Sequence, residues 1–219
     1  MSDQKNFHCY TIGHSNHNIE DFIQTLHEFH IKCIIDVRSI PSSNYMTQFN
    51  RENLQTWLER EGIEYKYLGN MIGGRYTDPD LLDSQGSVDY EKVEQRPVFQ
   101  LGIDQVCQII NAGISAALMC AEKDPLDCHR FVLVSKALVK RGISIDHIVF
   151  DGTKDSAGKL VGTLISNKDL EKKLQEMYKS HNDLNALYRR RNKEMAFNIH
   201  GKTSKTKQEV NRQLDSFFS

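Results

Sequence analysis

Short apolar segments alternate along this chain with segments whose apolar residues recur at helical spacing. Five segments have the length and composition of buried strands, namely residues 7–12, 31–37, 63–68, 114–119 and 144–150. Four helical patterns lie between them, and they begin near Asn18, Asn50, Val98 and Phe131. This alternation predicts an α/β domain with a mainly parallel sheet and helices on both faces, a Rossmann-like three-layer arrangement.

The charge of the chain is unevenly distributed. Residues 1–152 carry 14 Lys and Arg against 21 Asp and Glu, a balance of −7, whereas residues 153–219 carry 14 against 8, a balance of +6. A helical pattern over residues 169–188 precedes Arg189, Arg190 and Arg191. We therefore expect an α/β domain over residues 1–152, followed by a helical, basic and partly flexible C-terminal extension over residues 153–219.

Composition and terminal sequence indicate the compartment. No apolar stretch approaches the roughly 18 residues that a membrane span needs, and the mean hydropathy is −0.54. The N-terminus lacks the basic start and apolar run of a signal peptide. We expect a cytoplasmic protein without membrane contact.

Five cysteines without CxxC spacing argue against a disulfide framework and against a common structural zinc motif. Cys9, Cys33 and Cys107 lie inside apolar patterns and are expected in the core. Cys120 and Cys128 instead belong to a polar segment that follows the strand pattern at residues 114–119. These two thiols are the chemically informative ones.

The segment from Cys120 to Arg130 combines thiol, carboxylate, imidazole and guanidinium groups directly before a helical pattern. We expect Asp124 to cap that helix, with Pro125 at its first position. The first turn of a helix has unpaired N–H groups and a partial positive charge, so it favours anions and thiolates. Cys128 is expected within about one turn of that end.

Polar or glycine-rich residues follow the other predicted strands as well. They are Gly13, His14 and Ser15 after the first strand, Asp36, Arg38 and Ser43 after the second, and Gly73, Gly74 and Arg75 after the third. Parallel strands with right-handed crossovers place their carboxyl ends at one edge, where ligands bind in such sheets. We expect these residues to join the Cys120–Arg130 segment in one site, although the glycine pair also fits a plain turn.

Four motifs in this order resemble the domain-of-unknown-function 488 family over about residues 7–151. They are TIGHS at 11–15, DVRSIPSS at 36–43, GIEYKYLGNMIGG at 62–74 and MCAEKDPLDCHR at 119–130. The resemblance implies an α/β domain whose motif residues gather at one site, and it supplies no settled activity. The positions it implicates are Gly13, His14, Ser15, Asp36, Arg38, Pro41, Cys120, Glu122, Pro125, Cys128, His129 and Arg130.

The chemistry of these residues favours an enzyme acting on an anionic, phosphate-bearing substrate such as a nucleotide or nucleic acid, as a hydrolase or transferase. Cys128 is the expected nucleophile, His14 or His129 the acid or base, and Asp36 or Glu122 the group that orients them. The expected substrate contacts are Gly13, Ser15, Arg38, Ser43, Gly73, Gly74, Cys120 and Arg130, with the two arginines binding the anion. The Cys-x5-Arg spacing of a phosphatase loop is missing.

Two alternatives stay open. Cys120, Cys128, Glu122 and either His14 or His129 could hold a zinc or iron ion. Neighbouring residues of a helix point about 100° apart, so Cys128 and His129 are expected not to share one ion, and we expect a site without metal. The other alternative is a non-catalytic nucleic-acid-binding module that uses the basic residues 189–212. The residues do not identify a cofactor.

Overall fold

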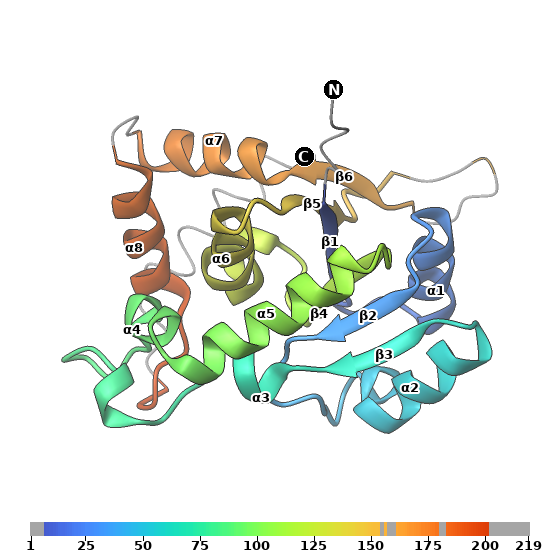
Figure 1. The fold of residues 1–219 in the computed structure, drawn as a ribbon, viewed down its shortest axis with the longest axis horizontal. Coiled ribbons are helices and arrows are strands. Elements are labelled where there is room, and N and C mark those ends of the chain that lie inside the picture. Colours follow the sequence, from blue (N-terminus) through green and yellow to red (C-terminus); the bar gives the residue numbers. More distant parts are fainter. Residues whose placement is uncertain (1–6, 154–155, 157–160, 180–182, 202–219) are drawn as a thin grey trace.

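The computed structural model describes residues 7–153, 156, 161–179 and 183–201 (Figure 1). The described residues form one six-stranded sheet in the order β3-β2-β4-β1-β5-β6. Its strands are β1 (His8–Gly13), β2 (Cys33–Asp36), β3 (Glu64–Tyr67), β4 (Ala116–Cys120), β5 (Ser144–Val149) and β6 (Thr163–Ser166). Strands β1 to β5 are parallel, and β6 pairs antiparallel with β5. The expected α/β fold is confirmed.

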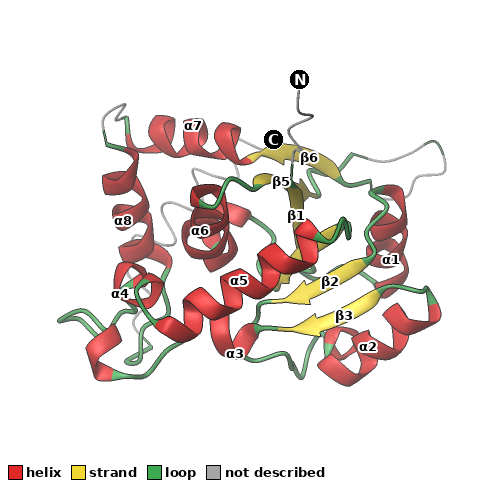
Figure 2. Cartoon of the chain, in the orientation of Figure 1, coloured by secondary structure: helices red, strands yellow, loops and turns green. Residues whose placement is uncertain are grey.

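Helices cover both faces of the sheet (Figure 2). On one face, α1 (Ile19–Glu28) and α2 (Arg51–Arg60) pack in a cluster that includes Ile34 of β2. On the other face, α5 (Pro97–Asn111), α6 (Lys136–Lys140) and a π-helical turn at Arg130–Ser135 pack in a second cluster that includes Leu118 of β4. Because β-strand side chains alternate between faces, β2 and β4 contribute to both clusters.

The start of α1 follows the sequence pattern. The side chain of Asn18 accepts a hydrogen bond from the backbone N–H of Asp21 at 2.7 Å, and Phe22 and Leu26 are buried on the inner face. Asn50 precedes α2 but does not cap it. Its side-chain oxygen accepts the N–H of Ser43 at 2.6 Å instead, which holds the loop after β2.

The segment after β3 begins with the short helix α3 (Gly69–Ile72), which is outside the four helical patterns of the sequence. The segment after β4 differs from expectation. Asp124 caps only a single 3-10 turn, Pro125–Asp127, and a separate helical segment begins at Arg130. Between them Cys128 is extended, with φ −129° and ψ 141°, so the expected continuous helix from Pro125 is wrong.

The described residues after position 153 add to the same sheet and core. Beyond β6, α7 (Asn167–Tyr178) buries Leu170 and Leu174, and α8 (Leu184–Met195) buries Leu187 against the cluster that contains Leu118. Arg189, Arg190 and Arg191 lie within α8 rather than in an arm after it. Lys202, Lys205, Lys207 and Arg212, the rest of the expected basic arm, lie outside the described residues.

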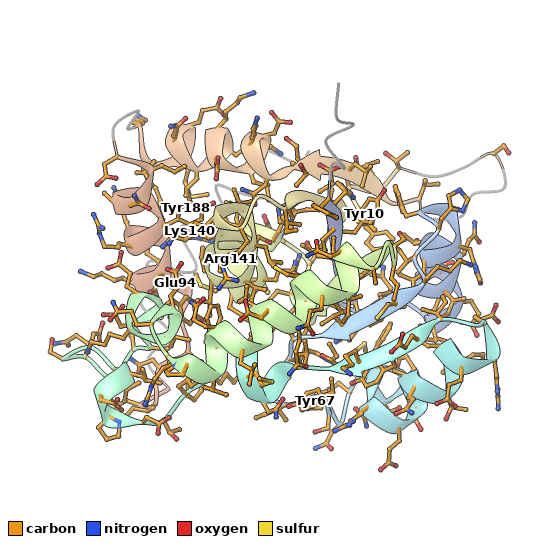
Figure 3. All side chains as sticks on the ribbon, in the orientation of Figure 1. Tyr10, Tyr67, Glu94, Lys140, Arg141 and Tyr188 are labelled. Atoms are coloured by element: carbon orange, nitrogen blue, oxygen red, sulfur yellow. The ribbon has the colours of Figure 1, made fainter. Side chains whose placement is uncertain are left out.

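Ion pairs connect the helices on the α5 face. Glu94, at the end of the short helix α4 (Tyr90–Glu94), accepts hydrogen bonds from Lys136 and Lys140 at 3.3 and 2.5 Å. Arg141 pairs with Asp104 of α5. Figure 3 labels Glu94, Lys140 and Arg141, which lie where α4, α5 and α6 meet. Cys9 and Cys33 are buried in the core beneath these helices, and Cys107 is partly buried against it, as expected.

No helix within the described ranges combines the length and the apolar character that crossing a membrane requires.

Candidate functional site

A cavity of about 300 Å³ opens at the carboxyl ends of β2 and β4. Residues named for the site from the sequence line it, among them Arg38, Gly74, Arg75, Cys120, Glu122 and His129. Met195 at the end of α8 and residues 196–198 after it supply a further wall. The other predicted residues lie behind these walls or at the surface nearby.

The strand order brings three of the predicted turns together. In the sheet β4 lies between β2 and β1, so the ends of these strands are neighbours. The N–H of His14 bonds the carbonyl of Cys120 at 2.9 Å, and the N–H of Val37 bonds the carbonyl of Met119 at 3.1 Å. The expected convergence at one sheet edge is present in the described structure for the turns after β1, β2 and β4.

Cys120, Glu122, Cys128 and His129 form a compact group that we call the thiol cluster. The Sγ atoms of Cys120 and Cys128 both bond Oε2 of Glu122, at 2.8 and 3.1 Å. Each Sγ also lies 3.8 Å from Nδ1 of His129. Four side chains, from the end of β4 and the segment after it, therefore present two sulfurs, one nitrogen and one oxygen to the same small volume.

The extended backbone of Cys128 makes this convergence possible. Adjacent residues on a helix diverge by about 100°, but Cys128 precedes the helical turn that begins at Arg130. Its sulfur and the imidazole of His129 thus turn to the same side, and the backbone N–H of Arg130 points to the sulfur at 3.4 Å. The expectation that Cys128 and His129 diverge is wrong.

The imidazole of His129 is fixed from its far side. Its Nε2 bonds the carbonyl of Val37 at 3.0 Å; with the proton on Nε2, that nitrogen donates and Nδ1 faces the sulfurs. Gly74 packs directly on the ring, since a Cβ there would lie 2.7 Å from its Cγ. The ring is buried in this orientation, with one edge at the cavity.

The two thiols of the cluster differ in acidity. Burial and the neighbouring Cys128 raise the pKa of Cys120. Burial also raises the pKa of Cys128, but the hydrogen bond from Cys120 and the charges of Arg130 and His129 outweigh it and lower the pKa to about 6. Burial opposes ionisation of Glu122 too, yet His129 and the hydrogen bonds of the thiols lower its pKa to about 2. Cys128 is the more acidic thiol, whereas Cys120 is the one that faces the cavity.

Arg130 supports the cluster from inside the protein. Its side chain is fully buried and donates to the carbonyls of Glu122 and Lys123 at 2.6 and 3.0 Å. Gly13 permits this approach, because a Cβ on Gly13 would lie 2.0 Å from the carbonyl oxygen of Glu122. Arg130 therefore anchors the loop after β4 and places a positive charge behind Cys128; it does not line the cavity.

Arg38 lines the cavity but is already engaged. Its guanidinium forms a paired contact with Asp36, with Nε at 2.9 Å from Oδ1 and Nη2 at 2.6 Å from Oδ2, and Nη2 also donates to the carbonyl of Phe49. Nη1 lies 3.1 Å from Nε2 of His14. Burial and the charge of Arg38 lower the pKa of His14 to about 4, so His14 is neutral near pH 7 and accepts this bond.

Three further predicted residues have local contacts outside the cavity lining. Ser15 has φ 46° and bonds the side chain of Asn16. The hydroxyl of Ser43 accepts the N–H groups of Tyr45 and Met46 in a turn. Gly73 packs on Ser39, since a Cβ would lie 2.3 Å from that hydroxyl.

Two lining residues had no assigned role in the sequence. Ser39 lies within the motif at residues 36–43, which was the available signal, and its hydroxyl accepts the N–H of Arg75 at 3.0 Å. Arg75 was expected at this edge of the sheet, and it directly follows the motif at residues 62–74. Residues 195–198 lie in none of the four motifs, so no sequence pattern indicated that they line the cavity.

The comparisons with known proteins identify a family without an assigned activity. A family model described as "Domain of unknown function DUF488" matches residues 18–137. This range contains three of the four motifs, including the whole thiol cluster. No curated protein and no solved structure matches the chain. Since the match covers more than half of the sequence, the chain belongs to the DUF488 family.

Proposed function

We propose that this protein is an enzyme, a hydrolase or transferase, that binds an anionic, phosphate-bearing substrate in the cavity beside the thiol cluster. The observation that carries the proposal is that one cavity joins two arginines, Arg38 and Arg75, with Cys120, Glu122 and His129. Cavities that combine positive charge with groups able to donate or accept protons are typical of active sites.

Arg75 is the expected principal contact for the anion. It is exposed at the cavity, and its guanidinium lies 5.6 Å from the centre of the Phe197 ring. Such stacking on the ring face orients the guanidinium while leaving its edge for a ligand. Arg38 adds positive charge at the same wall, although Asp36 uses most of its hydrogen-bonding capacity.

The thiol cluster supplies the groups for the reaction. The Nδ1 atom of His129 is positioned to accept or transfer a proton, and the carboxylate of Glu122 orients the two thiols by accepting hydrogen bonds from them. Cys120 is the thiol placed to meet a substrate, in contrast to the expected nucleophile Cys128, whose side chain is fully buried behind it. Arg130 and Gly13 act by positioning this group rather than by touching substrate.

Anion binding provides the first test. Calorimetry with inorganic phosphate, pyrophosphate and nucleoside triphosphates should show saturable binding to the wild-type protein. A phosphate-release assay on the same compounds tests for hydrolysis. Loss of a hydrogen bond to a charged group costs roughly 1.5–3 kcal/mol, so Arg75→Ala should weaken binding about 10-fold or more. Arg96→Ala is the matched control, because Arg96 is a surface residue paired with Asp80 and lies outside the cavity lining.

Two results would count against the proposal. One is the absence of saturable binding for every phosphate compound; the other is equal affinity in wild type and Arg75→Ala. If nucleic acid binds both variants equally and the affinity falls steeply with salt, the non-catalytic module becomes the better explanation. Replacing Lys202, Lys205, Lys207 and Arg212 with alanine would then test the basic segment.

A further inference from the structure

We propose that the thiol cluster is a binding site for a zinc-class divalent ion, with Cys120, Cys128 and His129 as ligands and Glu122 as the fourth donor. The ligand atoms of Cys120, Cys128 and His129 all lie within 4.8 Å of one another. Two sulfurs and an imidazole nitrogen match the preference of zinc and ferrous ions rather than that of magnesium or calcium.

The distances fit a tetrahedral ion. Zn–S bonds of about 2.3 Å and Zn–N bonds of about 2.0 Å place sulfur and nitrogen ligands roughly 3.5 Å apart around a tetrahedral centre. Both Sγ atoms lie 3.8 Å from Nδ1 of His129. Both sulfur–nitrogen separations are therefore within a few tenths of an ångström of the tetrahedral value.

Glu122 occupies the position that a fourth donor needs. Its Oε2 accepts from the sulfurs of Cys120 and Cys128, so the two thiol protons occupy the space between these three atoms. Ion binding displaces the protons that the two sulfurs still hold: each S–H bond that breaks is replaced by a metal–sulfur bond, and its proton leaves to solvent. The oxidation state of sulfur and metal does not change in this step.

The surroundings hold the ligands as in known metal sites. Metal-bound histidines commonly donate their second ring N–H to a carbonyl, and Nε2 of His129 contacts the carbonyl of Val37. The N–H of Arg130 points to the Cys128 sulfur. Two thiolates and one carboxylate carry three negative charges, so a divalent ion and the buried guanidinium of Arg130 together bring the site to neutrality.

The position of the cluster makes an ion there accessible. Cys120, Glu122 and His129 line the cavity, while Cys128 lies behind them. An ion held by these four donors would therefore sit in the wall next to the proposed substrate space, with its tetrahedral coordination filled by the protein as in structural zinc sites.

Metal analysis tests the inference directly. Protein purified under reducing conditions should retain about one zinc or iron ion per chain. After removal of the ion with a chelator, titration with Co²⁺ should saturate near one equivalent and produce a thiolate-to-cobalt charge-transfer band. Cys120→Ser and Cys128→Ser should each lose most of that band, whereas Cys107→Ser, which alters a cysteine outside the cluster, should keep it.

The wild-type titration keeps the test decisive even if a cluster variant folds poorly. The inference is overturned if reduced wild-type protein binds neither Zn²⁺ nor Co²⁺ at micromolar concentration, or if the band persists in both variants. It is also overturned if Cys120 and Cys128 form a disulfide and the reduced protein still takes up no ion. Phosphate binding at Arg75 is measured separately, so failure of the metal site and failure of the proposed function are distinguishable.

Discussion

At the scale of a single residue, His147 should make stability depend on pH. Its fully buried imidazole bonds the hydroxyl of Thr11 at 2.7 Å and lies 3.2 Å from the side-chain oxygen of Asn167. Burial and the charge of Arg130 lower its pKa to about 3, whereas an unfolded chain has a histidine pKa near 6.5. Below pH 6.5 the unfolded state takes up a proton that the folded state does not, so stability falls as the pH approaches 3.

The expected contribution is up to about 1.4 kcal/mol per pH unit within that window. Denaturant unfolding of wild type and His147→Gln between pH 6.5 and 4 should show a shallower pH slope in the variant, because glutamine does not titrate. His200→Gln, at an exposed position, is the control and should follow the wild type. Parallel slopes for wild type and His147→Gln would contradict the assignment.

At the scale of an element, Arg191 should decide whether α8 stays docked. Its side chain is 2% exposed, donates to the carbonyl of Leu126 at 2.9 Å and pairs with Asp127 and Glu194. Breaking a buried ion pair costs roughly 3–5 kcal/mol, so Arg191→Met should lower the free energy of unfolding by about 3 kcal/mol. Since α8 leads into residues 195–198 of the cavity wall, phosphate binding should weaken as well.

Arg190→Ala gives the matched comparison for this helix. Arg190 is largely exposed and pairs with Glu194 at the surface, where an ion pair contributes about 0–1 kcal/mol. Denaturant unfolding of the two variants separates the effects. A loss as small for Arg191→Met as for Arg190→Ala would show that the buried contacts do not hold α8.

At the scale of the whole molecule, the chain after residue 153 should unfold together with the sheet. β6 pairs with β5, and Leu174 of α7 is buried in the cluster that also contains Leu118 of β4. A Leu→Ala change in a core costs about 2–5 kcal/mol. Leu174→Ala should therefore shift one common transition, seen by circular dichroism and by fluorescence of Trp57 on the opposite face.

Trp57 is the single tryptophan of the chain, so its fluorescence reports α2 alone. Lys172→Ala, an exposed substitution on the same helix as Leu174, should leave the midpoint nearly unchanged. If the circular dichroism of Leu174→Ala showed an early phase while the Trp57 transition stayed in place, the C-terminal elements would be an independent unit.

The sequence by itself determined the elements and the edge of the sheet where the motifs gather. Strand and helix periodicity are local properties, which is why the five parallel strands and the capping of α1 by Asn18 follow from the order of residues. Parallel strands then place their following turns at one edge, so His14, Arg38 and Cys120 are neighbours by topology. The β6 pairing was missed because the segment is short and only partly buried.

Only the tertiary structure decided which contacts the side chains of those residues make. Asp36 engages Arg38, and backbone carbonyls of the loop after β4 engage Arg130, so neither arginine is the free anion clamp that its charge suggested. Because the backbone at Cys128 is extended, its sulfur lies next to the imidazole of His129, although the two side chains were expected to diverge. Periodicity reports which side of an element is buried. The hydrogen-bond partners of a buried side chain, however, are often distant in sequence and close in space, so only the packed fold determines which groups it binds.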